Sequence, residues 1–240
     1  MTLDRVAPTR RPDRAVTGRQ RWLDLLFMHW SAPPEVVRPL LPAGLELDVH
    51  DGKAWIGLVP FAMKDIRPSW VPKALGLDFL ETNVRTYVHH DGEPGVYFFS
   101  LEAASNFAVK VARWQWSLAY HHADMRMERD GDRVRYETTR RSNQARLSVE
   151  YTIGEALGPS PVGTFEHFLL ERYYLFVEHE GRLFQGQVHH VPYPAHRAEV
   201  HRLEDGLVAA AGLPAVSFPP EVVHCSPGVT VEVFGPWPCT

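Results

Sequence analysis

The stretch ETNVRTYV, residues 81–88, has the alternating pattern of a β-strand with two different faces. Successive side chains of a strand point to opposite sides, so the even-numbered residues share one face and the odd-numbered residues the other. The even-numbered row is β-branched throughout, which is typical of packing within a sheet. The odd-numbered row is an acid, an amide, a guanidinium and a phenol: Glu81, Asn83, Arg85 and Tyr87. The pattern leaves open whether this polar row faces solvent or forms the wall of a cavity.

Similar strand patterns recur along the chain, with a few short helices between them. Hairpin turns are predicted at Asp51-Gly52, with arms in residues 45–63, and at Glu180-Gly181. Helical signals cover residues 34–42, 104–118, 204–211 and a segment ending near Arg172. The helices are too few for a doubly wound α/β fold. We therefore expect an α+β, mainly β fold, built as an antiparallel or mixed barrel or sandwich.

The length and composition favour one large domain. The chain has 240 residues, of which 45% are hydrophobic and 22% charged, enough for a single sizeable core. Residues 1–20 are rich in Arg, Pro and Thr and poor in large apolar groups, which predicts a mobile N-terminal arm. The domain is then expected to span residues 21–240.

Charge and cysteine content narrow the classes of partner. The net charge of −4 gives no electrostatic support to a nucleic-acid or acidic-membrane partner. No apolar run approaches the roughly 20 residues that span a bilayer, and no secretory signal is recognisable. Cys225 and Cys239 are expected to be free thiols in a reducing compartment. These features predict a cytoplasmic protein.

Motifs for metal or cofactor chemistry are missing from the sequence. The histidine doublets at residues 89–90, 121–122 and 189–190 would place neighbouring side chains on opposite faces of a strand, so no metal site is predicted. Gly-x-Ser-x-Gly and phosphate-binding glycine loops do not occur. We expect no cofactor.

Polar side chains set among aromatic residues are the candidates for a binding site. Charges that face the inside of a barrel are costly unless they are paired or meet a polar ligand. The candidates are Glu81, Asn83, Arg85, Tyr97, Ser100, Arg113, Tyr120, His121, Glu171, Arg172 and His190.

Several of these residues lie in sequence blocks that resemble a known family. WIGLVPFAM, FLETNVRTYV, GVYFFSLEA, ARWQWSLAYHHADM, LLERYYLF and VHHVPYP are similar to blocks of the YqjF-like family of uncharacterised bacterial proteins, in the same order, from about residue 20 to 235. That family is similar in fold to acetoacetate decarboxylase. The resemblance implies a partly open, cone-like β-barrel that encloses a polar cavity.

The resemblance also shows where this chain departs from the decarboxylase. The decarboxylase pattern has an arginine on a helix, followed by a Pro-Lys-Lys turn whose lysine forms a Schiff base. Arg113 fits the arginine, but Ala-Tyr-His-His at residues 119–122 replaces the lysine pair. The missing nucleophile argues against Schiff-base decarboxylation, and Lys110 is poorly placed to substitute. The glutamate of FLETN, Glu81, matches a cavity glutamate of the decarboxylase.

Three hypotheses for the function remain open. In the first, the cavity binds a small carboxylate or oxo acid through Arg85 and Arg113, and Glu81, Tyr120 and His121 handle protons in a lyase- or hydrolase-like reaction. In the second, the same cavity only selects a ligand, as in a sensory domain. In the third, the polar groups form an internal network of a structural barrel. The apolar strand edges make a homodimer a further expectation.

Overall fold

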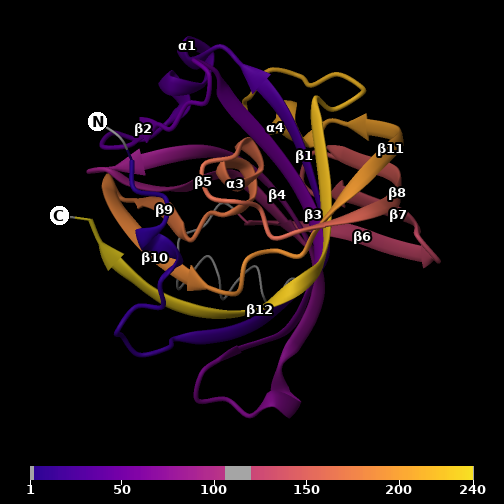
Figure 1. Cartoon of the computed structure of the whole chain (residues 1–240). Helices are drawn as coiled ribbons and strands as arrows, with labels where there is room; N and C mark the ends of the chain where they lie inside the picture. Colours follow the sequence, from indigo (N-terminus) through magenta and orange to yellow (C-terminus); the bar gives the residue numbers. More distant parts are fainter. Residues whose placement is uncertain (1–2, 106–119, 240) are drawn as a thin grey trace.

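The computed structural model describes residues 3–105 and 120–239 as a sheet-rich fold with short helices (Figure 1). The strands are β1 (Gly18–Ala32), β2 (Glu46–Leu47), β3 (Ala54–Pro68), β4 (Leu77–His90), β5 (Glu93–Ala103), β6 (Tyr120–Asp130), β7 (Arg133–Arg140), β8 (Arg146–Gly158), β9 (Tyr174–His179), β10 (Arg182–His189), β11 (Ala195–Asp205) and β12 (Val222–Pro238). The α-helices are α1 (Pro34–Val37), α3 (Phe165–Leu170) and α4 (Leu207–Ala210), with 3-10 turns at Ala7–Thr9, Arg38–Leu40 and Lys73–Leu75.

These elements confirm the predicted α+β class, mainly β with a few short helices. The helix predicted over residues 104–118 falls almost entirely on residues 106–119, which lie outside the described part of the chain. Within residues 3–105 and 120–239, each helix is too short or too polar to cross a membrane.

The strands form one ring-like sheet that branches at β5 and at β12. Between these two strands the order is β12-β1-β3-β4-β5. The far edge of β5 is shared, because residues 95–97 pair in parallel with β9 and residues 101–103 pair in parallel with β6. β12 is also shared between two strands, because it pairs in the antiparallel direction with β11 and, farther along, with β10. The five central strands therefore have β6, β7, β8 and β11 on one side and β9 and β10 on the other (Figure 1).

Each side of the central strands has its own hydrophobic core. The first core joins the even-numbered residues of β1 and β3, such as Met28 and Leu58, to side chains of β7, β8 and α4. The second core joins odd-numbered residues such as Phe27 and Phe61 to α3, β10 and β12. Strands that alternate apolar side chains on both faces can serve two cores at once.

β4 lies between the two cores, and every residue from 81 to 88 is buried. On its even-numbered face, the Thr82 hydroxyl lies 3.0 Å from the Thr138 hydroxyl of β7. Its odd-numbered face, with Glu81 only 3% exposed and Arg85 only 8% exposed, turns toward the second core. The polar row of β4 is therefore not a solvated face.

The predicted hairpin around Asp51-Gly52 is correct only at its turn. Asp51 and Gly52 both have positive φ, as a tight two-residue turn requires, but a single bridge joins His50 to Lys53. Beyond that bridge, β3 pairs with β1 on one edge and with β4 on the other, so no edge of β3 is left for β2. β2 instead pairs with Val88 and His89 of β4, beyond the point where the β3 ladder ends.

The N-terminal segment contacts the strands at several points. The Arg5 guanidinium pairs with Asp48, and Arg11 Nε lies 2.6 Å from a carboxylate oxygen of Glu232. The Gln187 side chain donates hydrogen bonds to the carbonyl oxygens of Pro8 and Arg10 at 3.0 and 3.1 Å. These contacts place the segment along the sheet, while the mobility predicted for residues 1–20 stays a prediction.

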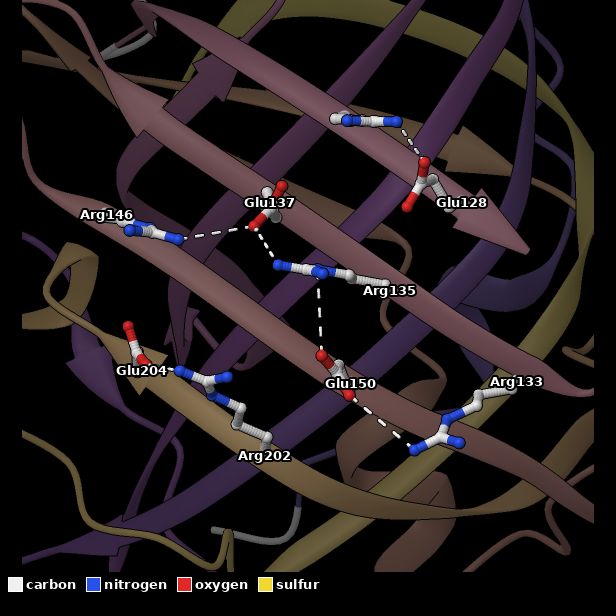
Figure 2. Close-up of polar contacts among 9 residues, drawn as sticks. Glu128, Arg133, Arg135, Glu137, Arg146, Glu150, Arg202 and Glu204 are labelled. Atoms are coloured by element: carbon white, nitrogen blue, oxygen red, sulfur yellow. Dashed lines mark hydrogen bonds and ion pairs between the residues drawn. The ribbon is translucent and has the colours of Figure 1, made fainter. Parts of the chain in front are cut away.

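The outward face of β6, β7, β8 and β11 carries alternating arginines and glutamates (Figure 2). Arg135 and Arg146 both contact Glu137, at 3.0 and 3.4 Å, and these side chains are substantially exposed. Exposed ion pairs of this kind contribute about 0–1 kcal/mol each. This face is solvated, and its arginines are paired with carboxylates.

Gly95 marks the branch where β5 meets β9, and we expect its replacement by alanine to destabilise the protein. A Cβ at this position would lie 2.6 Å from the Tyr174 carbonyl oxygen and 2.7 Å from the Phe176 ring. The resulting overpacking should cost about 1–3 kcal/mol in the free energy of unfolding, measured by urea denaturation. Gly206→Ala is the control, because its Cβ would meet atoms only at 3.6 Å or beyond. If both substitutions lowered the free energy of unfolding equally, the close contact between β5 and β9 at Gly95 would be contradicted.

Candidate functional site

A cavity of about 530 Å³ lies on the second-core side of the central strands. Along β4, its wall takes alternate residues from one end of the strand to the middle: Leu77, Phe79, Glu81, Asn83 and Arg85. At about 3.3 Å per residue, this row is roughly 26 Å long. Trp70 and Leu75, which are 82% and 68% exposed, belong to the wall as well and mark its mouth. The cavity therefore runs along β4 from an open apolar end to a buried polar end.

Glu81 and Tyr120 form a buried pair in the cavity wall. The Tyr120 hydroxyl, at the start of β6, donates a hydrogen bond of 2.7 Å to Glu81 Oε2. Burial raises the pKa of Glu81 from 4.5 to about 8; the hydrogen bond from Tyr120 opposes this shift, and the charge of Glu102 adds to it. Glu81 is thus largely a neutral carboxylic acid at pH 7, able to donate a proton or a hydrogen bond.

Arg85 lines the buried end of the cavity without a carboxylate partner. Its Nη2 donates a hydrogen bond of 3.3 Å to the Leu169 carbonyl oxygen, and its Nε has no hydrogen-bond partner in residues 3–105 and 120–239. The guanidinium also lies 5.6 Å from the centre of the Phe27 ring. Among the described residues, no ion pair joins Arg85 to an acid, whereas the buried Arg140 and Arg172 each pair with one.

The arginines of the outward face have carboxylate partners, whereas Arg85 has none in the part of the chain that the structure describes. In water, the arginines of β7 and β8 are surrounded by carboxylates (Figure 2). Arg85 is removed from water and lacks that compensation, although an uncompensated buried charge costs several kcal/mol. An anion placed beside Arg85 would supply the missing partner.

Asn83 and Tyr193 complete the polar end of the cavity. The Asn83 carboxamide oxygen is buried and has no hydrogen-bond partner within the described part of the chain. Tyr193 follows β10 and lines the same end, and burial raises the pKa of its hydroxyl well above the usual value. Tyr193 belongs to the polar residues that stand among aromatics in the sequence, although it is not one of the predicted site residues. Its position between two prolines in VPYP, directly after a buried strand, is the signal that could have found it.

Three other predicted site residues take part in buried contacts away from the cavity. Ser100 donates a hydrogen bond of 2.9 Å to Glu102. Glu171 accepts hydrogen bonds from the Tyr173 hydroxyl at 2.6 Å and from the Tyr193 backbone N–H at 2.9 Å. Arg172 pairs with Asp48 at 2.6 Å. Their hydrogen-bonding groups are largely used within the protein, and none of the three belongs to the cavity wall.

The remaining predicted site residues lie outside the cavity wall or outside the described part of the chain. The His190 ring stacks on Tyr173 with centroids 4.6 Å apart, and its Nδ1 lies 2.7 Å from the Val191 carbonyl oxygen. Tyr97 packs edge-on against Phe99. His121 directly follows Tyr120 in β6, so the alternation of the strand turns it away from the cavity. Arg113 lies outside the described residues.

Groups for a Schiff base or a metal are not found in the described part of the cavity. Lys53, Lys64 and Lys73 do not line its wall, and Lys110 lies outside the described residues. Across residues 3–105 and 120–239, no group of three or more His, Cys, Asp or Glu side chains is placed to hold a metal ion.

Comparisons with known proteins give one family and one fold. The family model DUF2071, an uncharacterized conserved protein, matches residues 19–230. The uncharacterized protein YqjF of Bacillus subtilis (strain 168) is 35% identical over 204 residues, which cover 84% of each chain.

The similar solved structures share the fold at low sequence identity. The enduracididine biosynthesis enzyme MppR, complexed with the condensation product of pyruvate and imidazole 4-carboxaldehyde, has a TM-score of 0.65 and 14% identity; the match covers 94% of this chain and 90% of MppR. An acetoacetate decarboxylase-like enzyme from Sphingomonas wittichii RW1 has a TM-score of 0.62 and 13% identity, covering 94% of both chains. At these identities the likeness shows the fold alone.

Proposed function

We propose that this protein, which belongs to the DUF2071 family of uncharacterized conserved proteins, binds a small carboxylate or oxo acid in the cavity along β4. The observation that carries the proposal is Arg85, a buried arginine in the cavity wall that has no acidic partner among the described residues. A guanidinium binds a carboxylate through two parallel hydrogen bonds, and such bonds are strong where water is excluded.

The fold supports an oxo acid as the type of ligand. MppR, which has the same fold, has been solved in complex with pyruvate. In this chain, Glu81 would lie beside the ligand as a neutral acid held by Tyr120, and the carboxamide oxygen of Asn83, which has no hydrogen-bond partner among the described residues, could accept a hydrogen bond. A neutral carboxyl group with a pKa of about 8 can donate a hydrogen bond to a ketone oxygen or move a proton near neutral pH.

Binding without turnover is the alternative that the same geometry allows. Glu81 and Tyr120 could select the protonation state and shape of a ligand without reacting with it. The described lysines do not reach the cavity, so the proposal contains no Schiff base. Incubation with acetoacetate or pyruvate, followed by product analysis by NMR, separates the two: saturable binding without product leaves only ligand binding.

Removing the charge of Arg85 should abolish most of the affinity for pyruvate and acetoacetate. A hydrogen-bonded charged pair contributes about 1.5–3 kcal/mol, so Arg85→Met should weaken binding roughly 10- to 150-fold by isothermal titration calorimetry. Arg135→Met is the matched control, since Arg135 lies on the solvated outer face (Figure 2). Unchanged affinity in Arg85→Met, with the control also unchanged, would reject Arg85 as the anion-binding residue.

The cytoplasmic location and the homodimer remain parts of the proposal. Cys225 and Cys239 are both free thiols in the structure, and a reducing compartment would keep them in that state.

A further inference from the structure

The cavity is longer and more apolar than a short oxo acid requires. From Arg85 to Leu77 the wall extends over roughly 26 Å of strand. A molecule the size of pyruvate, bound at Arg85, would occupy only the buried end. The rest of the wall would stay without a ligand contact.

The wall changes character along its length. Its polar groups without a full set of protein partners gather at the buried end, around Arg85, Asn83 and Glu81. Toward the mouth, the β4 row continues with Phe79 and Leu77, and other elements add apolar side chains such as Met63, Ile66, Val71 and Leu75. A ligand that matches this wall is polar at one end and apolar along the rest of its length.

The mouth offers no second free cation among its described lining residues. Arg67 lies there, but its Nε donates a hydrogen bond of 2.9 Å to Asp65, so its charge is already paired. Gln20, also in the wall, accepts a hydrogen bond of 2.8 Å from Trp22 Nε1. The wall therefore favours a molecule with one carboxylate over a dicarboxylate.

We propose that the ligand is a monocarboxylic acid with a long apolar chain, whose carboxylate lies at Arg85 and whose chain extends along β4 toward Trp70. This inference rests on the proposed function, because it assigns the chain of the ligand whose acid group Arg85 holds. The burial of each additional methylene in the apolar part of the cavity then strengthens binding.

A chain-length series tests the inference directly. The affinities of acetate, butanoate, octanoate, dodecanoate, hexadecanoate and octadecanoate are measured by calorimetry or by competition with a bound acid. The expected gain is about four-fold for each added methylene until the chain reaches the mouth. Affinity that stays flat beyond butanoate would overturn the inference and leave the proposed function intact. If no acid of the series binds, the inference is overturned, whereas the proposed function is tested separately by the pyruvate and acetoacetate titrations.

A variant at the mouth tests where the chain lies. Leu77→Asp places a charge in the apolar wall, at the far end of the row from Arg85. That distance exceeds the screening length of about 8 Å at physiological salt, so butanoate binding should stay within two-fold of the wild type. Octadecanoate binding should weaken by about ten-fold or more, because its chain is long enough to meet the new charge.

Leu157→Asp is the matched control for this variant. Leu157, on β8, is a similarly exposed leucine that does not line the cavity. Leu157→Asp should leave the affinities for the short and the long acid unchanged. Equal losses for butanoate and octadecanoate in Leu77→Asp, or unchanged octadecanoate binding, would contradict a chain that lies along β4 to the mouth.

Discussion

Replacing Glu81 with glutamine is expected to stabilise the folded protein by roughly 5 kcal/mol at alkaline pH and to have little effect at acid pH. In the folded state, burial raises the pKa of Glu81 from 4.5 to about 8, so the carboxyl group stays protonated where the unfolded chain would ionise. A shift of this size corresponds to roughly 5 kcal/mol. Glutamine is never charged and can still accept the hydrogen bond from Tyr120, so it escapes this cost.

The sign of the pH dependence follows from proton binding. Below about pH 4.5 both states of the wild type are protonated, and the contribution of Glu81 to stability is fully present. Between about pH 4.5 and 8 the unfolded state releases the proton and the folded state keeps it, so wild-type stability falls as pH rises. Above about pH 8 the difference in stability between the wild type and Glu81→Gln levels off. Urea denaturation at about pH 5, 7 and 9 measures this course.

The control for this experiment is Glu128→Gln. Glu128 is an exposed carboxylate on the outer face of β6, and its replacement should change stability by no more than about 0.5 kcal/mol at each pH (Figure 2). A pH-independent effect of Glu81→Gln would show that Glu81 ionises normally in the folded protein. If the predicted pH dependence is observed, a purely structural role explains Glu81 poorly. Glutamine would fill that role without the loss of stability that the glutamate brings at neutral and alkaline pH.

The polar row of β4 shows what sequence patterns can and cannot determine. Alternation in residues 81–88 correctly separated two faces, because the side-chain period of a strand is a local property. It left open whether Glu81 and Arg85 face solvent, since that depends on strands placed far away in sequence. In the structure, β7 covers one face and the second core covers the other. The family resemblance contributed the cavity, which the local pattern did not contain.

The polar residues near α3 show the opposite case. Glu171 and Arg172 have the composition of a binding site, since acid and guanidinium stand next to aromatic residues. Their partners are nevertheless supplied by the protein, and Asp48, which pairs with Arg172, lies 124 residues away in sequence. The residue types in the sequence indicate which side chains could bind a ligand, whereas only the three-dimensional contacts show which of them already have hydrogen-bond partners. Arg85 stands out only once that distinction is made.

Replacing Arg140 with methionine is expected to destabilise the protein by about 3–5 kcal/mol at neutral pH. Arg140 of β7 donates two hydrogen bonds to Glu102 Oε1, at 2.5 and 3.1 Å, and both side chains are buried. Glu102 lies in the part of β5 that pairs with β6, beside Tyr120. Burial already raises the pKa of Glu102 against the opposing charge of Arg140, so removing Arg140 leaves a buried acid without its partner.

A second substitution distinguishes this loss of charge compensation from a loss of packing. Adding Glu102→Gln to Arg140→Met removes the stranded acid and should recover most of the lost stability, to within about 1–2 kcal/mol of the wild type. The single variant should also be less destabilised at about pH 5 than at about pH 8, because Glu102 is protonated more readily in acid. If the single and double variants unfold at the same urea concentration at every pH, the stability lost in Arg140→Met comes from packing. The Arg140–Glu102 ion pair would then not stabilise the part of β5 that pairs with β6.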